Sequence, residues 1–384
     1  MKLSSREMLA RLIAFPTVSS ASNLDCIEFI RAYLASHGVE SRLVPSPDGQ
    51  KANLFATVGP TVEGGVVLSG HTDVVPVDGQ AWTTDPWVLT ERDGRLYGRG
   101  ACDMKGFDAL ALAAVPDMLR AGLKRPFHLA LSYDEEVGCT GAPPMVEEMA
   151  RVLPTPSAVI VGEPSLMRVV TGHKGSVSWF TTVRGHTVHS SRIDIGVSAT
   201  MTAARLVTWL DDTMEENKRR ADPDNPFLPP WTTLHCGTLN GGIATNVVAA
   251  ECRFVTEVRA IPTEDPWSYK DRFEAYVREV IEPRMRAVAP DTGVDIEFRA
   301  AVAGLAPEVD GEAERLVRRL TGDNGLHVVS YGTEAGIFQK AGWSTVVCGP
   351  GDIDQAHQAD EFIAVSEFEA GEAFIRRLTS ELAA

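Results

Sequence analysis

Apolar residues recur every three or four positions at the start of the chain, which predicts two amphipathic helices there. Gly38 follows the second apolar run and indicates where that helix ends. Arg6, Glu7 and Arg11 interrupt the first run, as expected for an amphipathic helix and not for the apolar stretch of a signal peptide. The apolar positions are Met8, Leu9, Leu12 and Ile13 in the first run and Ile27, Ile30 and Leu34 in the second.

Short runs rich in β-forming residues then alternate with helical stretches, which predicts an α/β fold with a central mixed sheet flanked by helices. The β runs cover residues 53–58, 66–69, 127–133, 158–161 and 345–348, and the clearest helical stretches cover residues 105–121 and 142–149.

Polar residues follow four of these β runs directly. They are Gly-His-Thr-Asp at 70–73, Asp-Glu-Glu at 134–136, Gly-Glu-Pro at 162–164 and Gly-Pro-Gly at 349–351. In open α/β sheets, ligands bind at the carboxyl ends of the strands, where such loops converge. The pattern therefore predicts one binding site built from these four segments.

The pattern changes between residues 176 and 300, where strand, helix, strand, strand, helix and strand follow one another. This βαββαβ order is that of a ferredoxin-like unit. We therefore expect a smaller domain, residues 176–300, inserted into a larger one formed by residues 1–175 and 301–384. The expected elements cover residues 177–183, 197–210, 232–237, 247–259, 267–288 and 294–298.

His71 and Asp73 form an His-x-Asp pair after a β run. One side chain can bind a metal ion while the other accepts its second ring N–H, although a capped histidine in a polar loop would look the same. Asp103 precedes a helix that begins near residue 105. It is a candidate ligand with glycines on both sides, or simply the helix N-cap.

Three adjacent carboxylates, Asp134, Glu135 and Glu136, repel one another unless cations or protons compensate. A solvated acidic turn is the alternative. Because adjacent side chains point in different directions, Glu136 could bind a metal ion while Glu135 faces a bound water as general base. Such a division suits metal-assisted hydrolysis.

Glu163 and His357 complete a set of two histidines and three carboxylates with His71, Asp103 and Glu136. Nitrogen and oxygen ligands in this number match a two-metal site with a bridging aspartate, and Zn²⁺ accepts them, as do Co²⁺ and Mn²⁺. The combination is far more specific than any single motif.

Composition narrows the classes of function. The chain has 384 residues, of which 44% are hydrophobic and 23% charged, an ordinary globular mixture. No stretch approaches the roughly 20 apolar residues of a membrane span. With 52 acidic and 36 basic residues, the net charge of −16 disfavours nucleic acid and anionic lipid as partners.

The six cysteines are scattered and form no Cys-x-x-Cys pair, unlike a disulfide framework or a thiolate zinc site. We therefore expect reduced thiols and a cytoplasmic protein. The cysteines are Cys26, Cys102, Cys139, Cys236, Cys252 and Cys348.

A series of motifs resembles the acetylornithine deacetylase, succinyl-diaminopimelate desuccinylase and carboxypeptidase family of co-catalytic zinc amidohydrolases. The resemblance covers nearly the whole chain, and it implies that the inserted domain is a lid that also forms a homodimer. The motifs are, in order, GHTDVVPV, GRGACDMKG, YDEEVGCTGA, GEPS, GHKG, VHSS and GPGDIDQAHQADE.

The resemblance implies roles for individual residues. Two zinc ions per subunit would be bound, with Asp103 as the bridge, Glu135 as general base and Asp73 as the partner of His71. The lid residue His189 would stabilise the oxyanion, often in the active site of the opposite subunit, and Asn246 and Arg259 would bind substrate. The metal ligands would be His71, Asp103 and Glu163 for one ion and Asp103, Glu136 and His357 for the other.

The segments 331–339 and 353–358 look more like the acetylornithine deacetylases of this family than like its desuccinylases. The small-molecule substrate expected from this likeness is N2-acetyl-L-ornithine, cleaved to L-ornithine and acetate in arginine biosynthesis. Deacylation of another N-acyl amino acid, such as a succinylated one, and dipeptidase or carboxypeptidase activity are alternatives. A non-catalytic binding homologue is disfavoured because every ligand and the base are present, and a serine hydrolase because the chain has no Gly-x-Ser-x-Gly elbow.

Overall fold

The computed structural model describes residues 2–384, and these divide into two compact units. The first unit comprises residues 1–172, 305–328 and 333–384, and the second comprises residues 173–304 and 329–332. The expected boundaries at 176 and 300 lie a few residues inside these. Each unit has its own hydrophobic core.

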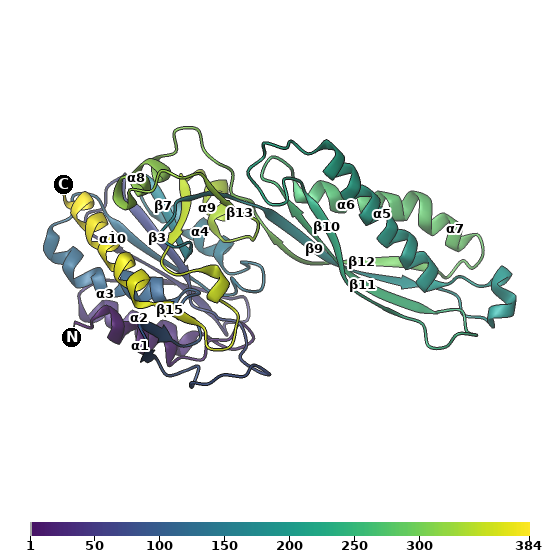
Figure 1. Cartoon of the computed structure of the whole chain (residues 1–384), viewed down its shortest axis with the longest axis horizontal. Helices are drawn as coiled ribbons and strands as arrows, with labels where there is room; N and C mark the ends of the chain where they lie inside the picture. The colour runs from purple at the N-terminus through teal and green to yellow at the C-terminus, as the bar shows by residue number, and fades with distance from the viewer. Residues whose placement is uncertain (1) are drawn as a thin grey trace. The chain divides into compact units, whose positions relative to one another are not determined.

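The first unit contains an eight-stranded mixed sheet flanked by helices (Figure 1). Its central strands β6, β3, β7 and β14 are parallel neighbours in that order. In spatial order the strands are β1 (Ser41–Pro45), β2 (Ala52–Val58), β6 (Phe127–Ser132), β3 (Val66–His71), β7 (Ala158–Pro164), β14 (Thr345–Gly349), β8 (Val170–His173) and β13 (His327–Val329). The α/β fold expected from the sequence is confirmed, and the four predicted polar segments lie at or just beyond the carboxyl ends of the parallel strands.

Helices cover both faces of this sheet, and α3 packs against both α1 and α10. The helices are α1 (Ser5–Ile13), α2 (Leu24–Ser36), α3 (Lys105–Ala121), α4 (Ala142–Val152), α8 (Glu312–Thr321), α9 (Ala335–Lys340) and α10 (Val365–Ala383), with a 3₁₀ turn η3 (Ile353–Gln355). A separate three-stranded sheet contains β15 (Phe362–Ala364), β5 (Arg95–Tyr97) and β4 (Thr90–Arg92), in that order.

Helix α1 shows how local sequence fixes an element. Ser4 is its N-cap and forms a capping box with Glu7, so that two backbone amides without helical partners are satisfied. All four predicted apolar positions of this helix are buried in the core of the first unit. The predicted amphipathic helix is therefore confirmed.

The second unit has the βαββαβ order expected from the sequence. Its antiparallel sheet has the strand order β10-β11-β9-β12, and the helices pack on one face around Trp179, Phe254 and Phe273. The elements are β9 (Gly175–Arg184), η1 (Ser190–Ile195), α5 (Ala199–Arg220), β10 (Thr233–Gly241), β11 (Glu251–Ala260), α6 (Pro266–Tyr276), η2 (Val277–Ile281), α7 (Glu282–Arg286) and β12 (Gly293–Val302).

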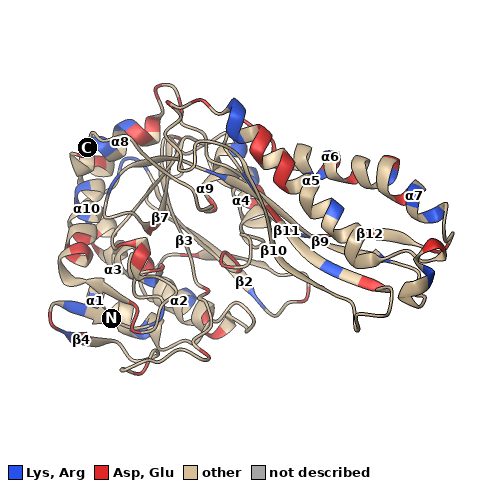
Figure 2. Cartoon of the chain, turned by 45° about the vertical axis from the view of Figure 1, so that its right-hand side comes forward, with Lys and Arg blue, Asp and Glu red and all other residues tan. Residues whose placement is uncertain are grey.

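Charged residues of both signs alternate along the helices of this second unit (Figure 2). Pairs such as Glu216 with Arg220 and Glu274 with Arg278 lie one helical turn apart. Exposed pairs of this kind contribute little to stability, so they are typical of solvated helix faces. No helix among residues 2–384 is long and apolar enough to cross a membrane.

A buried histidine in the central sheet makes the stability of the first unit depend on pH. His128 on β6 is 1% exposed, its Nδ1 lies 2.9 Å from Thr57 Oγ1, and Nε2 has no partner among the described residues. Burial lowers the pKa of His128 to about 4. Because the unfolded chain takes up this proton near pH 6.5 and the folded chain does not, stability is lost as the pH falls from about 6.5 towards 4.

We expect His128→Gln to lose less stability between pH 7 and pH 5 than the wild type, by about 2 kcal/mol. The measurement is urea unfolding of both proteins at the two pH values, monitored with a spectroscopic signal that reports on the first unit. Equal losses in the two proteins would show that His128 does not carry this pH dependence.

Candidate metal centre

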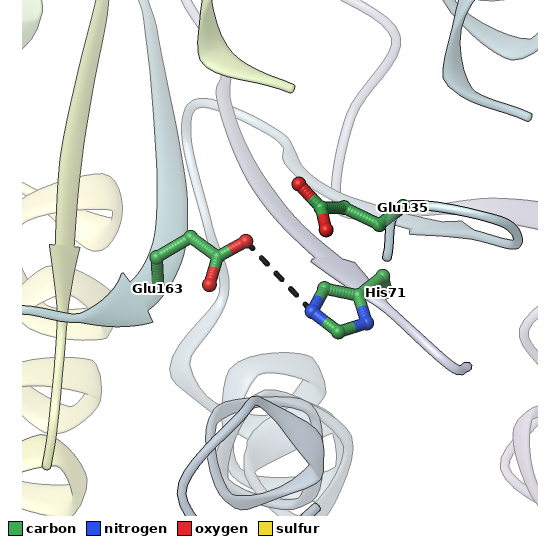
Figure 3. Close-up of side chains that lie close together, drawn as sticks. All are labelled: His71, Glu135 and Glu163. Atoms are coloured by element: carbon green, nitrogen blue, oxygen red, sulfur yellow. Dashed lines mark ion pairs between the residues drawn. The ribbon is translucent and has the colours of Figure 1, made fainter. Parts of the chain in front are cut away.

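The polar segments at the carboxyl ends of the parallel strands meet in the first unit. His71 is the last residue of β3, Glu163 lies in β7, and Glu135 follows β6. Figure 3 shows these three side chains converging from their separate elements. One oxygen or nitrogen atom from each of the three lies within 4.8 Å of the others, close enough to share one metal ion.

His71 is the centre of the first group of side chains. Its Nε2 lies 3.1 Å from Asp103 Oδ1 and 3.8 Å from Glu163 Oε1, the latter drawn as the dashed line in Figure 3. All three side chains are at most 6% exposed. The structure therefore brings together the three residues that the family resemblance implies as ligands of one ion.

His357 is the centre of the second group. Its Nε2 lies 3.2 Å from Asp103 Oδ2 and 3.0 Å from Glu136 Oε2. The two oxygens of Asp103 thus face different histidines, Oδ1 towards His71 and Oδ2 towards His357. A carboxylate that bridges two metal ions needs its oxygens turned this way.

The alternative role considered for Asp103, helix N-cap, does not fit the structure. The N-cap of α3 is Met104, and no side chain caps this helix. The Asp103 carboxylate is 5% exposed and points to the two histidines instead. The acidic run is likewise not a solvated turn, since the Glu136 side chain is only 7% exposed.

Asp73 has more contacts than the sequence predicts. The nearest partner of His71 Nδ1 is the Asp73 carbonyl oxygen, at 2.9 Å, whereas the carboxylate oxygen Oδ1 lies 3.6 Å away. The carboxylate accepts the backbone N–H groups of Glu135 and Glu136, at 3.1 and 3.3 Å. Asp73 therefore supports both His71 and the loop that carries the acidic pair.

Two further side chains, which the sequence analysis does not select, contact Asp73 and Glu135. Ser19 donates its hydroxyl to Asp73 Oδ2 at 2.7 Å, and Cys139 Sγ lies 3.1 Å from Glu135 Oε1. Ser19 lies more than 50 residues from Asp73 in the chain, so no local pattern connects them. Cys139 could have been noticed because it follows Glu135 by four residues in the same motif.

The pKa values show an excess of negative charge. Burial raises the pKa of Glu163 well above its usual range, and the carboxylates of Asp103 and Glu135 raise it further. The hydrogen bonds with Asp103 and Glu136 raise the pKa of His357 to about 10. Both shifts favour the protonated forms of these groups, and divalent cations would offset the same negative charge.

Glu135 differs from the other carboxylates of the site because, among residues 2–384, the side chain hydrogen-bonded to it is the Cys139 thiol. Burial raises the pKa of Glu135 to about 8, although the positive charge of His71 opposes the shift. A carboxylate whose pKa is close to neutrality can both accept and return a proton. This property is what a general base in amide hydrolysis requires.

The three predicted lid residues lie in the second unit at two separate places. His189 pairs with Val247 in an isolated β-bridge, and Ser190 N–H donates to the Asn246 carbonyl at 3.0 Å, so His189 and Asn246 are neighbours. Both residues are exposed. His189 Nδ1 lies 2.8 Å from Ser191 Oγ.

Arg259 lies near the other end of strand β11 and forms an ion pair with Glu257 at 2.9 Å. From Glu251, where the strand begins, to Arg259 the chain advances about 26 Å at the usual rise per strand residue. The structure therefore does not bring Arg259 together with His189 and Asn246 within one chain.

Two neighbouring clusters of nitrogen and oxygen ligands at the edge of an α/β sheet, with the Glu135 carboxylate beside them, define a hydrolase of the metallopeptidase kind. The chain belongs to peptidase family M20/M25/M40, whose sequence profile matches residues 67–381. The resemblance drawn from the motifs is thereby confirmed.

Individual proteins that are similar to this chain include deacetylases and peptidases. The chain is 37% identical to an acetylornithine deacetylase of Myxococcus xanthus over 97% of this chain and 96% of the relative. Its fold is similar to that of an M20 family metallo-carboxypeptidase of Sulfolobus solfataricus, with a TM-score of 0.77 and 17% identity over 99% and 98% of the two chains. It is also similar to a dinuclear metal-binding M20 peptidase of Bacillus subtilis, with a TM-score of 0.65 and 14% identity over 98% and 97%.

Proposed function

We propose that this hydrolase cleaves the amide bond of N2-acetyl-L-ornithine, yielding L-ornithine and acetate, with two divalent metal ions bound in each subunit. The observation that carries the metal-dependent part is the position of Asp103, whose two oxygens face His71 and His357. The substrate is supported by several acetylornithine deacetylases that are 33–37% identical over nearly the whole chain. Release of ornithine would place the reaction in arginine biosynthesis, in the cytoplasm.

The ligand set fits a pair of divalent ions. His71, Asp103 and Glu163 would hold one ion and Asp103, Glu136 and His357 the other. Four carboxylates at this site, those three together with Glu135, carry four negative charges when ionised, and two divalent cations balance them. Zinc accepts this mixture of imidazole and carboxylate ligands, as do cobalt and manganese.

When bound, the ions would lower the pKa of a water molecule towards neutrality and polarise the amide carbonyl. Glu135 takes the proton from the attacking water and passes it to the leaving amine, so that the amide becomes an acid and a free amine. Asp73 keeps Glu135 in place by accepting its backbone N–H. Cys139 holds the Glu135 carboxylate on the other side.

The second unit would complete the site. We propose that His189 stabilises the oxyanion and that Asn246 and Arg259 bind the substrate. Because Arg259 lies at the opposite end of β11 from the other two, one chain is expected to supply Arg259 and a partner copy to supply His189 and Asn246. This proposal requires a homodimer formed through the second unit, which sedimentation analysis of the purified protein would detect.

The test of the proposed function is metal content together with a panel of amides. We expect about two zinc ions per chain, and cleavage of N2-acetyl-L-ornithine that stops on chelation and returns when zinc is added. The panel contains N-succinyl-diaminopimelate, other N-acetyl amino acids and a dipeptide. Metal binding with faster cleavage of another amide would retain the mechanism and reject the substrate, whereas a protein that binds no metal and cleaves nothing would refute the proposal.

A further inference from the structure

A buried ion pair lies outside the set of proposed ligands. Arg99 and Glu361 are each 1% exposed, and Arg99 Nη1 lies 2.7 Å from Glu361 Oε2. Burying two charges costs several kcal/mol each, and an apolar pair of similar volume is often at least as stabilising. Stability alone therefore does not explain this pair, and its other contacts indicate what it does.

Glu361 holds the loop that carries Asp103. Its Oε1 accepts the backbone N–H groups of Cys102 and Asp103, at 2.9 and 3.0 Å, and its Oε2 accepts that of Gly100 at 3.0 Å. The Glu361 carboxylate thus receives four hydrogen bonds, one from Arg99 and three from backbone N–H groups of the loop that carries Asp103. The loop is held through its main chain, which leaves the Asp103 carboxylate free to face the histidines.

Arg99 connects this loop to the segment that carries His357. Its Nη2 donates to Gln80 Oε1 at 2.5 Å, and Gln80 Nε2 donates to the carbonyl oxygen of His357 at 2.9 Å. His357 has a φ of 61°, a left-handed conformation that a residue other than glycine keeps only when its surroundings impose it. The Gln80 contact is one of those that impose it.

We propose that Glu361 and Arg99 are positioning residues, which hold the Asp103 loop and, through Gln80, the His357 segment in register for two metal ions. The inference rests on the proposed function, because it concerns the same two ligands. Asp103 and His357 are more than 250 residues apart in the chain, yet their side chains must stay within about 3 Å of each other. Arg99 also compensates the charge of Glu361, which otherwise would repel the nearby Asp103 carboxylate.

The test compares Glu361→Gln with Glu308→Gln, a matched control in the same unit. The Glu308 carboxylate also accepts a backbone N–H and side-chain donors, from Thr345, Ser344 and Gln339, but it does not contact the ligand loops. Zn²⁺ affinity is measured by competition with a chromogenic chelator, and kcat and KM are measured at saturating zinc. We expect Glu361→Gln to bind zinc 10–100-fold more weakly, with kcat reduced and KM nearly unchanged, and Glu308→Gln to match the wild type.

Gln80→Ala is a second variant, in case Glu361→Gln does not fold. Gln80 is only partly buried, and its removal leaves the ion pair intact. We expect about tenfold weaker zinc binding, together with a changed absorption spectrum of the cobalt-loaded protein, because the orientation of His357 is altered. The inference is overturned if folded Gln80→Ala keeps the zinc affinity and the cobalt spectrum of the wild type, and if any folded Glu361→Gln also keeps wild-type zinc affinity. If the wild-type protein itself binds no zinc, the proposed function fails first, so the two failures are distinguishable.

Discussion

Replacing Glu135 by Gln is expected to lower kcat for amide cleavage by about 10²–10⁴-fold while two metal ions remain bound. The amide side chain keeps the shape of Glu135 and its contact with Cys139, but it can no longer take a proton from water. Glu135 is not among the five proposed ligands, so the metal content should not change. The measurement is steady-state kinetics on the cleaved amide, with metal analysis of the same preparation.

The matched control for this variant is Glu147→Gln on the exposed face of α4, which should retain wild-type kcat. Turnover that survives in Glu135→Gln would show that another group is the base. Loss of metal from Glu135→Gln would instead make Glu135 a ligand, since its carboxylate lies within reach of His71 and Glu163.

Asp103→Asn is expected to remove both metal ions and with them the activity. One oxygen of Asp103 faces each histidine, so the substitution takes a charged ligand from both ions at once. The hydrogen bonds with His357 and His71 overcome the effect of burial and hold the pKa of Asp103 well below its usual range. We expect zinc affinity to fall by at least about 100-fold, measured by chelator competition, and activity to be lost at micromolar zinc.

Asp108→Asn is the control for this second variant. Asp108 is a buried aspartate in the first turn of α3, and neither of its oxygens has a partner among the described residues. Burial raises the pKa of Asp108 well above the usual range, which favours its uncharged form, and asparagine is uncharged with nearly the same shape. If both variants weakened zinc binding equally, the effect would come from disturbing the fold and not from losing a bridge.

The sequence predicts those helices and strands whose hydrophobic residues recur with a clear period or form a continuous run. The buried parallel strands and helices α1 to α4 were predicted within a few residues, because each has a continuous apolar run or a helical stripe. Strands β1 and β8 and the three-residue strands β4, β5, β13 and β15 were not predicted. They are short and none has a continuous apolar run, so the local pattern gives little signal for a strand.

The residues of the candidate site also divide into those that the sequence could predict and those that it could not. Residues that end predicted strands, such as His71 and Glu163, could be placed together because parallel strands end at one edge of a sheet. The contacts of Ser19, Cys139 and the Arg99–Glu361 pair could not be foreseen, since each depends on side-chain directions that only the folded chain defines. The extent of helix α5 was also underestimated. It continues to Arg220, where three basic residues favour the carboxyl end of the helix dipole.

The position of β14 has a consequence for synthesis on the ribosome. This strand lies between β7 and β8 in the sheet, yet it follows both of them in the chain by more than 170 residues. At usual elongation rates, the edge of β7 stays unpaired for roughly 10–40 s while the intervening residues are made. All residues of the second unit, 173–304 and 329–332, are synthesised before β14, so this unit is complete in sequence while the sheet of the first unit is still unfinished. An unpaired edge on a buried strand such as β7 can pair with other chains, so the nascent protein is expected to be most prone to aggregation during this interval.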